Sequence, residues 1–119
     1  MKLKLENLPA GLHGQRETLA RCLEAMNAAL PLQAVYVFGS HARGEAQSDS
    51  DLDLCVVADG AEHQLEAARQ WRRAMRRVWP GPSFTLVPLT PGRLAEKRAR
   101  KDHFFATVLD EGLLLASQD

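Results

Sequence analysis

Two aspartates stand two positions apart at the start of an apolar segment, in the run Ser50-Asp51-Leu52-Asp53-Leu54. Side chains two apart on a strand point to the same face, so Asp51 and Asp53 would project together while Leu52 faces the core. Two carboxylates this close raise each other's pKa unless a cation lies between them. Mg²⁺ prefers carboxylate and phosphate oxygens, and two such ions can hold both oxygens of a phosphoryl transfer. The pair therefore predicts a magnesium site.

A glycine–serine turn follows the apolar run 34–38 and precedes the aspartates. Gly39 lets the backbone approach a ligand closely, and Ser40 adds a hydroxyl beside the N–H groups of a short helix, which favour an anion. The phosphate-loop pattern G-x-x-x-x-G-K-[ST] is absent. We expect one side of the site to bind phosphates and the other their metal ions. Simpler interpretations stay open: exposed aspartates in a first turn, a plain turn at Gly39, a helix cap at Ser40, and an ion pair of Arg43 with Asp49 or Asp51.

The helices that would position these residues are indicated by apolar spacing. It predicts a helix over 12–30, which Pro31 ends, and a second helix over 65–78. Thr90 and Pro91 are typical of a helix start, so a third helix begins there and continues towards Gly112. The residues expected to face the core from the last two helices are Leu65, Ala68, Trp71, Met75, Val78, Phe104, Phe105, Val108 and Leu109.

Short segments rich in valine, leucine and aromatics predict strands at 34–38, 51–58 and 84–89, and the run 113–116 could add a last short strand. The order is helix, strand, strand, helix, strand, helix. It predicts an α/β (α+β) fold, a small mixed sheet flanked by helices, in a single domain over residues 1–119. About a dozen residues join the first two strands, which allows either a long hairpin or a crossover.

Composition limits the other possible partners. Lysine and arginine total 15 and match 15 aspartates and glutamates, so no overall field draws the chain to nucleic acid or a membrane. No apolar run is long enough to span a membrane, and Cys22 and Cys55 are expected to be buried free thiols of a cytoplasmic protein. Basic residues nevertheless crowd two helices, as solvated faces or as a local patch for triphosphate, RNA or an acidic partner. They are Arg69, Arg72, Arg73, Arg76, Arg77, Lys97, Arg98, Arg100 and Lys101.

The stretch from Gly39 to Leu54, with its Gly-Ser turn, its Arg43-Gly44 pair and its Asp-Leu-Asp run, resembles the signature of the polymerase-β-like nucleotidyltransferase superfamily. The short chain is similar to the minimal nucleotidyltransferase branch. The resemblance implies that ATP or another nucleoside triphosphate binds with two Mg²⁺ ions and that its nucleoside monophosphate passes to a hydroxyl, releasing pyrophosphate. Many minimal members are antitoxins of a HEPN toxin, a helical ribonuclease, and some adenylylate its tyrosine. A protein tyrosine or an RNA hydroxyl is the implied acceptor.

The same resemblance assigns roles to individual residues. It implies that Gly39 and Ser40 hold the terminal phosphates, with Arg43 on the same phosphate-binding side. It implies that Asp51 and Asp53 are the catalytic carboxylates that hold the metal ions.

One position departs from the family pattern. A third carboxylate is usual on the strand after the second long helix, and here that position is Thr85. Threonine adds no negative charge, so the second ion is expected to bind weakly and transfer to be slow or lost. Asp49 shares the alternation of Asp51 and Asp53 and could compensate, or it lies in the loop. A second function therefore stays open: a weakly active or inactive module that neutralises a toxin by contact.

Overall fold

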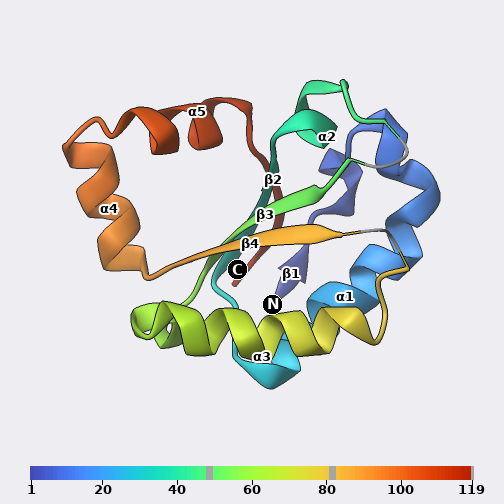
Figure 1. The fold of residues 1–119 in the computed structure, drawn as a ribbon, viewed down its shortest axis with the longest axis horizontal. Helices are drawn as coiled ribbons and strands as arrows, with labels where there is room; N and C mark the ends of the chain where they lie inside the picture. Colours follow the sequence, from blue (N-terminus) through green and yellow to red (C-terminus); the bar gives the residue numbers. More distant parts are fainter. Residues whose placement is uncertain (48–49, 81–82, 119) are drawn as a thin grey trace.

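The computed structural model describes residues 1–47, 50–80 and 83–118, which form a five-stranded sheet in the order β1-β5-β2-β3-β4. Strands β3 and β4 run parallel and the other neighbours antiparallel, so the sheet is mixed, as predicted (Figure 1). Because β2 and β3 are antiparallel neighbours, the connection between them is a long hairpin. The strands are β1 (Lys2–Leu3), β2 (Ala34–Phe38), β3 (Leu52–Val57), β4 (Phe84–Leu89) and β5 (Leu113–Ser117).

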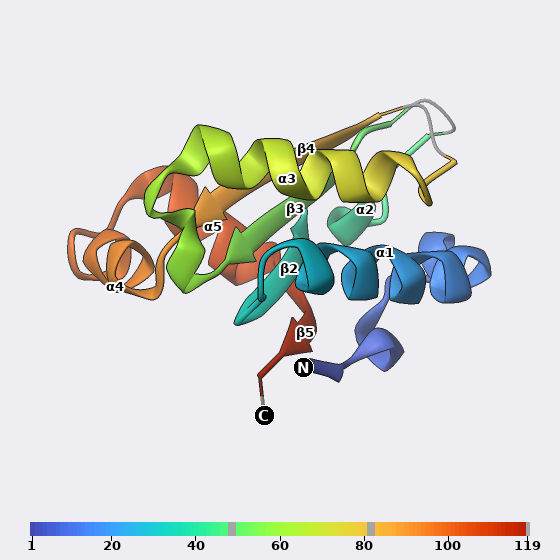
Figure 2. The same ribbon diagram turned by 90° about the horizontal axis from the view of Figure 1, so that it is seen from below.

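Helices cover both faces of this sheet. Helices α1 and α3 pack against each other and against one face, as the view from below shows (Figure 2). Helices α4 and α5 contribute Leu94, Phe105 and Val108 to a second apolar cluster on the other face. No helix in the described ranges is long and apolar enough to cross a membrane. The helices are α1 (Arg16–Ala29), α2 (Ser40–Arg43), α3 (Gln64–Arg76), α4 (Pro91–Ala99) and α5 (His103–Glu111), with 3-10 turns at Leu5–Asn7, Ala10–Gln15 and Asp59–Glu62.

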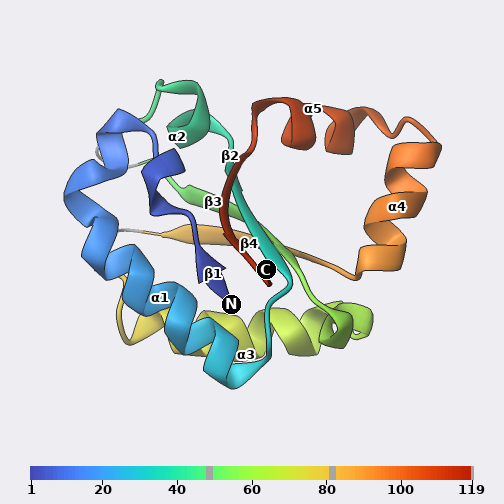
Figure 3. The ribbon, with the colours of Figure 1, turned by 180° about the vertical axis from the view of Figure 1, so that it is seen from behind.

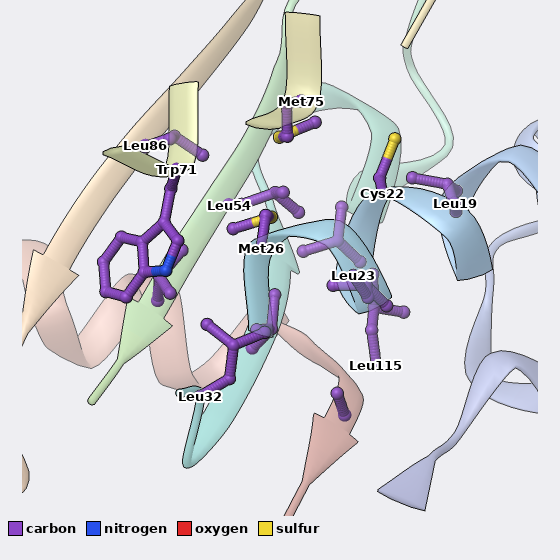
Figure 4. Close-up of a cluster of buried hydrophobic side chains, with 14 of the residues drawn as sticks. Leu19, Cys22, Leu23, Met26, Leu32, Leu54, Trp71, Met75, Leu86 and Leu115 are labelled. Carbon is purple, nitrogen blue, oxygen red and sulfur yellow. The ribbon is translucent and has the colours of Figure 1, made fainter. Parts of the chain in front are cut away.

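Strand alternation divides the core between these two layers. Val37 and Leu54 pack with α1 and α3, whereas Phe38 and Cys55 pack with α4 and α5. Trp71 is fully buried in the larger cluster, as predicted (Figure 4). Its indole N–H donates a hydrogen bond to the Leu30 carbonyl at 3.0 Å. Both cysteines are free and buried, as expected.

The third predicted helix is wrong as a single element. The chain forms two helices, α4 and α5, and turns between them at Lys101, whose φ is +55°. The side chain of Asp102 accepts a hydrogen bond from the Phe105 N–H at 3.2 Å and so caps the start of α5. Aspartate is a strong N-cap residue, and this local bond competes with continuation of the helix.

Two further expectations need correction, and one strand was not expected. Leu65 is 84% exposed, because the buried stripe of α3 consists of Ala67, Trp71 and Met75. Phe104 is half exposed, whereas Phe105 beside it is buried. Strand β1 was not expected: it pairs with β5 in an antiparallel register and brings the two ends of the described chain together (Figure 3).

Candidate active site

An open pocket of about 470 Å³ lies where β2 ends and β3 begins, with α5 as its opposite wall. The volume is in the range of small-molecule sites. The helices α2 and α5 flank the end of β2 in Figure 1. The five residues predicted as site residues, Gly39, Ser40, Arg43, Asp51 and Asp53, all line this pocket. The other lining residues are Phe38, Phe104, Thr107, Val108 and Glu111.

Gly39 forms the turn between β2 and α2 in a conformation that only glycine adopts readily. Its φ of +76° and ψ of −154° fall in a region that is closed to residues with a Cβ. A Cβ at this position would also collide with the Asp53 carboxylate. Gly39 is itself the N-cap of α2, so the interpretation of Ser40 as the cap is wrong. The glycine therefore brings backbone directly against one of the two carboxylates.

The two aspartates reach the pocket because the core holds the strand between them. Leu52 is 0% and Leu54 1% exposed, and Asp53 between them points to the opposite face of the sheet. Asp51 directly precedes β3 and is exposed, and it accepts a hydrogen bond from the Ser83 hydroxyl. Both carboxylates line one pocket, which confirms the prediction that Asp51 and Asp53 share a face.

The surroundings of Asp53 disfavour the charged form of its carboxylate. Burial raises its pKa above the ordinary value, and the negative charge of Asp51 raises it further. A hydrogen bond from Thr85 and the positive fields of His41 and Arg43 lower it, without cancelling the rise. The ionised Asp53 is therefore short of positive charge, and a bound cation would supply that charge.

Thr85 lies next to Asp53 on the neighbouring strand, in the parallel register of β3 and β4. Leu86 and Phe84 face the layer of α3, so Thr85 faces the carboxylates, as the alternation predicts. Within the described part of the chain, no group of three or more His, Cys, Asp or Glu side chains is placed to hold a metal ion. Asp49, the predicted substitute for a third acid, lies outside the described residues.

Arg43 joins α2 to α5 across the mouth of the pocket. Its Nε donates to Glu45 at 2.6 Å, and its Nη1 donates to Glu111 at 3.1 Å. The hydrogen bond to Glu45 is the main reason that the pKa of Arg43 is raised. The interpretation of Arg43 as an ion-pair partner of Asp51 is therefore wrong in the described structure. Sequence reasoning missed Glu111, because it lies 68 residues away from Arg43.

The wall formed by α5 was also missed. Phe104 is 50% exposed at the pocket and meets Phe38 edge-to-face at a centroid distance of 6.1 Å. It contacts Phe105 in the same way at 5.0 Å. A signal was present in the sequence, since adjacent helical residues point about 100° apart and two neighbouring phenylalanines do not share one buried face.

A family model described as a nucleotidyltransferase domain matches residues 19–114. The chain belongs to this family. The match contains every residue that lines the pocket, and it contains Thr85. A crystal structure of a protein assigned as a nucleotidyltransferase from Sulfolobus solfataricus is 25% identical to this nucleotidyltransferase domain; the alignment covers 71% of this chain and 70% of that one, with a TM-score of 0.47. No curated protein matches the present chain.

Proposed function

We propose that this nucleotidyltransferase domain transfers AMP from ATP to a hydroxyl of a protein or RNA acceptor. The observation that carries the proposal is that Asp51 and Asp53 meet the Gly39-Ser40 turn in one pocket. In the reaction, the acceptor oxygen forms a bond to the α-phosphorus as the bond from that phosphorus to the bridging oxygen breaks. Pyrophosphate leaves, and the proton of the hydroxyl passes to a base or to solvent.

The phosphate end of the nucleotide would lie at the start of α2. There the backbone of Gly39 is free of a Cβ, and Ser40 offers a hydroxyl to the pocket. Arg43 supplies positive charge from a position fixed by Glu45 and Glu111. Because both glutamates already use this guanidinium, a terminal phosphate would share Arg43 with them.

Asp51 and Asp53 would hold Mg²⁺. The fit rests on two observations: both are carboxylates on one pocket, and the pKa of Asp53 is raised by burial and by Asp51. Mg²⁺ bound there would polarise the phosphoryl oxygens and neutralise charge that develops on them. With neutral Thr85 in the third position, the protein offers two carboxylates. We expect one ion to bind firmly and a second to need the oxygens of the triphosphate.

The nucleobase would lie against Phe104. This ring is half exposed at the pocket, and Phe38 and Phe105 fix its plane by edge-to-face contacts. A ring held in this way offers a flat stacking surface with little entropy left to lose, and base stacking on an aromatic side chain contributes about 1–3 kcal/mol.

The acceptor that we propose is a tyrosine of a HEPN-type helical toxin, for which this domain would be the antitoxin. The experiment mixes the domain with such a partner, ATP and Mg²⁺, and measures the intact mass of the partner. We expect a gain of one AMP, which EDTA or Asp53→Asn abolishes. Asp59→Asn is the matched control, because Asp59 is exposed and lies outside the pocket. An unmodified partner under these conditions argues against transfer to this acceptor.

Thr85 favours a second candidate, a module that masks the toxin by contact without chemistry. A site short of one carboxylate loses stabilisation of the transition state, and each 1.4 kcal/mol lost slows transfer about tenfold. The two candidates separate in a toxin-activity assay. Contact alone neutralises the toxin without ATP, and Asp53→Asn neutralises it as well as the unaltered domain does.

A further inference from the structure

The outer face of α3 carries a dense group of arginines that the pocket does not use. Its inner face buries Ala67, Trp71 and Met75. At 100° per residue, the arginines occupy an arc of about 140° on the opposite, solvent side of the helix. Of the residues that the structure describes, these arginines alone line a surface hollow of about 350 Å³. This arginine face consists of Arg69, Arg72, Arg73 and Arg76 of α3 and of Arg77, the residue that caps its C-terminus.

The charge of the arginine face is poorly compensated. Among the described residues, only Arg69 has a carboxylate within ion-pair distance, Glu66 at 3.5 Å, and both groups are exposed. An exposed ion pair of this kind contributes little to stability. The whole chain has a formal charge of zero, so five arginines on one helix face are a local concentration of charge. An anionic ligand would relieve the repulsion among them.

The types of side chain indicate which anion fits. All the basic residues of α3 are arginines, whose planar forks bind phosphate oxygens in pairs, as a lysine does not. Arg72 lies over the Phe84 ring, 5.3 Å from its centroid, which combines a charge with an aromatic surface. From Arg69 to Arg77 the face extends about 12 Å along the helix axis, which exceeds the spacing of successive phosphates in a strand.

Among the described residues, no apolar side chain lines the hollow itself, whereas the centre of a protein interface is mostly apolar. The exposed large hydrophobic side chains of the described chain are Met1, Leu65 and Phe104, and none of them lines the hollow. We propose that the arginine face of α3 binds the phosphodiester backbone of a single-stranded nucleic acid. The proposal does not rest on nucleotidyl transfer, because the face lies outside the pocket and needs neither ATP nor Mg²⁺.

The test is fluorescence anisotropy with a labelled single-stranded RNA of about 15 nucleotides, the upper range of a single-strand site. No nucleotide or Mg²⁺ is added, so the outcome is independent of the transfer reaction. The variant Arg72→Gln/Arg73→Gln/Arg76→Gln should bind at least tenfold more weakly than the unaltered domain. Its plot of log affinity against log salt should be shallower by about 2, since each lost phosphate contact removes about 0.7 from the slope.

The matched control is Arg16→Gln/Arg21→Gln/Arg93→Gln, which removes the same charge from exposed positions on α1 and α4. It should keep the affinity and the slope, and thermal melting of both variants checks that they fold. Equal weakening in both variants overturns the proposal, as does a domain that does not bind the RNA. Polyglutamate that displaces RNA at equal charge concentration also overturns it, and points to an acidic protein partner instead.

Discussion

Replacing Thr85 with aspartate would place a third carboxylate next to Asp53. Thr85 and Asp53 are neighbours in the parallel register of β3 and β4. Neighbouring strands lie about 4.8 Å apart, so the two carboxylates would be roughly 5 Å apart. Thr85→Asp should therefore do two opposite things: destabilise the metal-free domain and strengthen its binding of Mg²⁺.

The size of the first effect follows from Coulomb's law. Two unit charges 5 Å apart repel by about 1 kcal/mol in water and about 3 kcal/mol at an effective dielectric constant of 20. Because Thr85 is exposed, the lower part of this range applies, about 1–2 kcal/mol. For a domain of this size that corresponds to a fall in Tm of about 4–8 °C without metal. Saturating Mg²⁺ should restore the loss, because the ion lies among the charges that repel.

The assay is thermal unfolding with EDTA and with Mg²⁺, followed by AMP transfer to the acceptor. Thr85→Asn is the control, since it removes the same hydroxyl next to Asp53 without adding charge. Its Tm should fall less than that of Thr85→Asp, and its binding of Mg²⁺ should not strengthen. Transfer by Thr85→Asp should rise at least tenfold, which corresponds to about 1.4 kcal/mol of barrier. If the unaltered domain already transfers rapidly and Thr85→Asp is unchanged or slower, Thr85 is not the vacant position. Another acid, Asp49 first, then supplies the missing ligand.

Four other substitutions test separate parts of the pocket. Burial raises the pKa of Asp53 in the folded domain above its ordinary value of about 4. The folded domain therefore loses stability as the pH rises from below about 4 through the raised pKa, because Asp53 becomes charged in an unfavourable place. Asp53→Asn should thus melt above the unaltered domain at pH 7 without metal, with a gap that closes near pH 3 and reverses in Mg²⁺. Ser40→Ala should weaken the binding of ATP, measured by calorimetry, more than the binding of AMP. Equal losses of affinity for the two nucleotides would refute a contact of Ser40 with the terminal phosphates. Phe104→Ala should weaken the binding of ATP but leave the binding of inorganic tripolyphosphate unchanged. A loss of affinity for both ligands would contradict stacking of the base on Phe104. Gly39→Ala should cost about 1–3 kcal/mol in urea unfolding and displace Asp53, whereas Gly44→Ala, at φ +74° with open space around it, should cost less and leave Mg²⁺ binding unchanged.

The side of the pocket that is built from residues close together in the sequence could be predicted. Gly39, Ser40, Asp51 and Asp53 lie within 15 residues of one another, and strand alternation fixes which of them face together. The position of Thr85 also followed from alternation. The sequence of β4 is typical of a strand, and the parallel pairing of β4 with β3 brings Thr85 beside Asp53.

The opposite wall could not be predicted in the same way. Its placement depends on the break at Lys101, after which the Asp102 side chain caps the start of α5. The separate helix α5 places Phe104 in the pocket and Glu111 beside Arg43. Contacts between residues so far apart in sequence leave no periodic signal, so a single sequence does not reveal them.

The core of the domain and the chemistry of its pocket are held by the same three residues of β3. Leu52 and Leu54 are almost fully buried, and their burial holds Asp53 between them on the face of the sheet that carries the pocket. The repulsion between the carboxylates is thus opposed by the burial of two leucines, which contributes about 1.5–3 kcal/mol each. A metal site that depended on a loop alone would relax by moving one carboxylate out. Here β3 holds Asp53 in place, and only Asp51, which precedes the strand and accepts a hydrogen bond from Ser83, could move out. A cation between the two carboxylates relieves the charge without breaking that hydrogen bond.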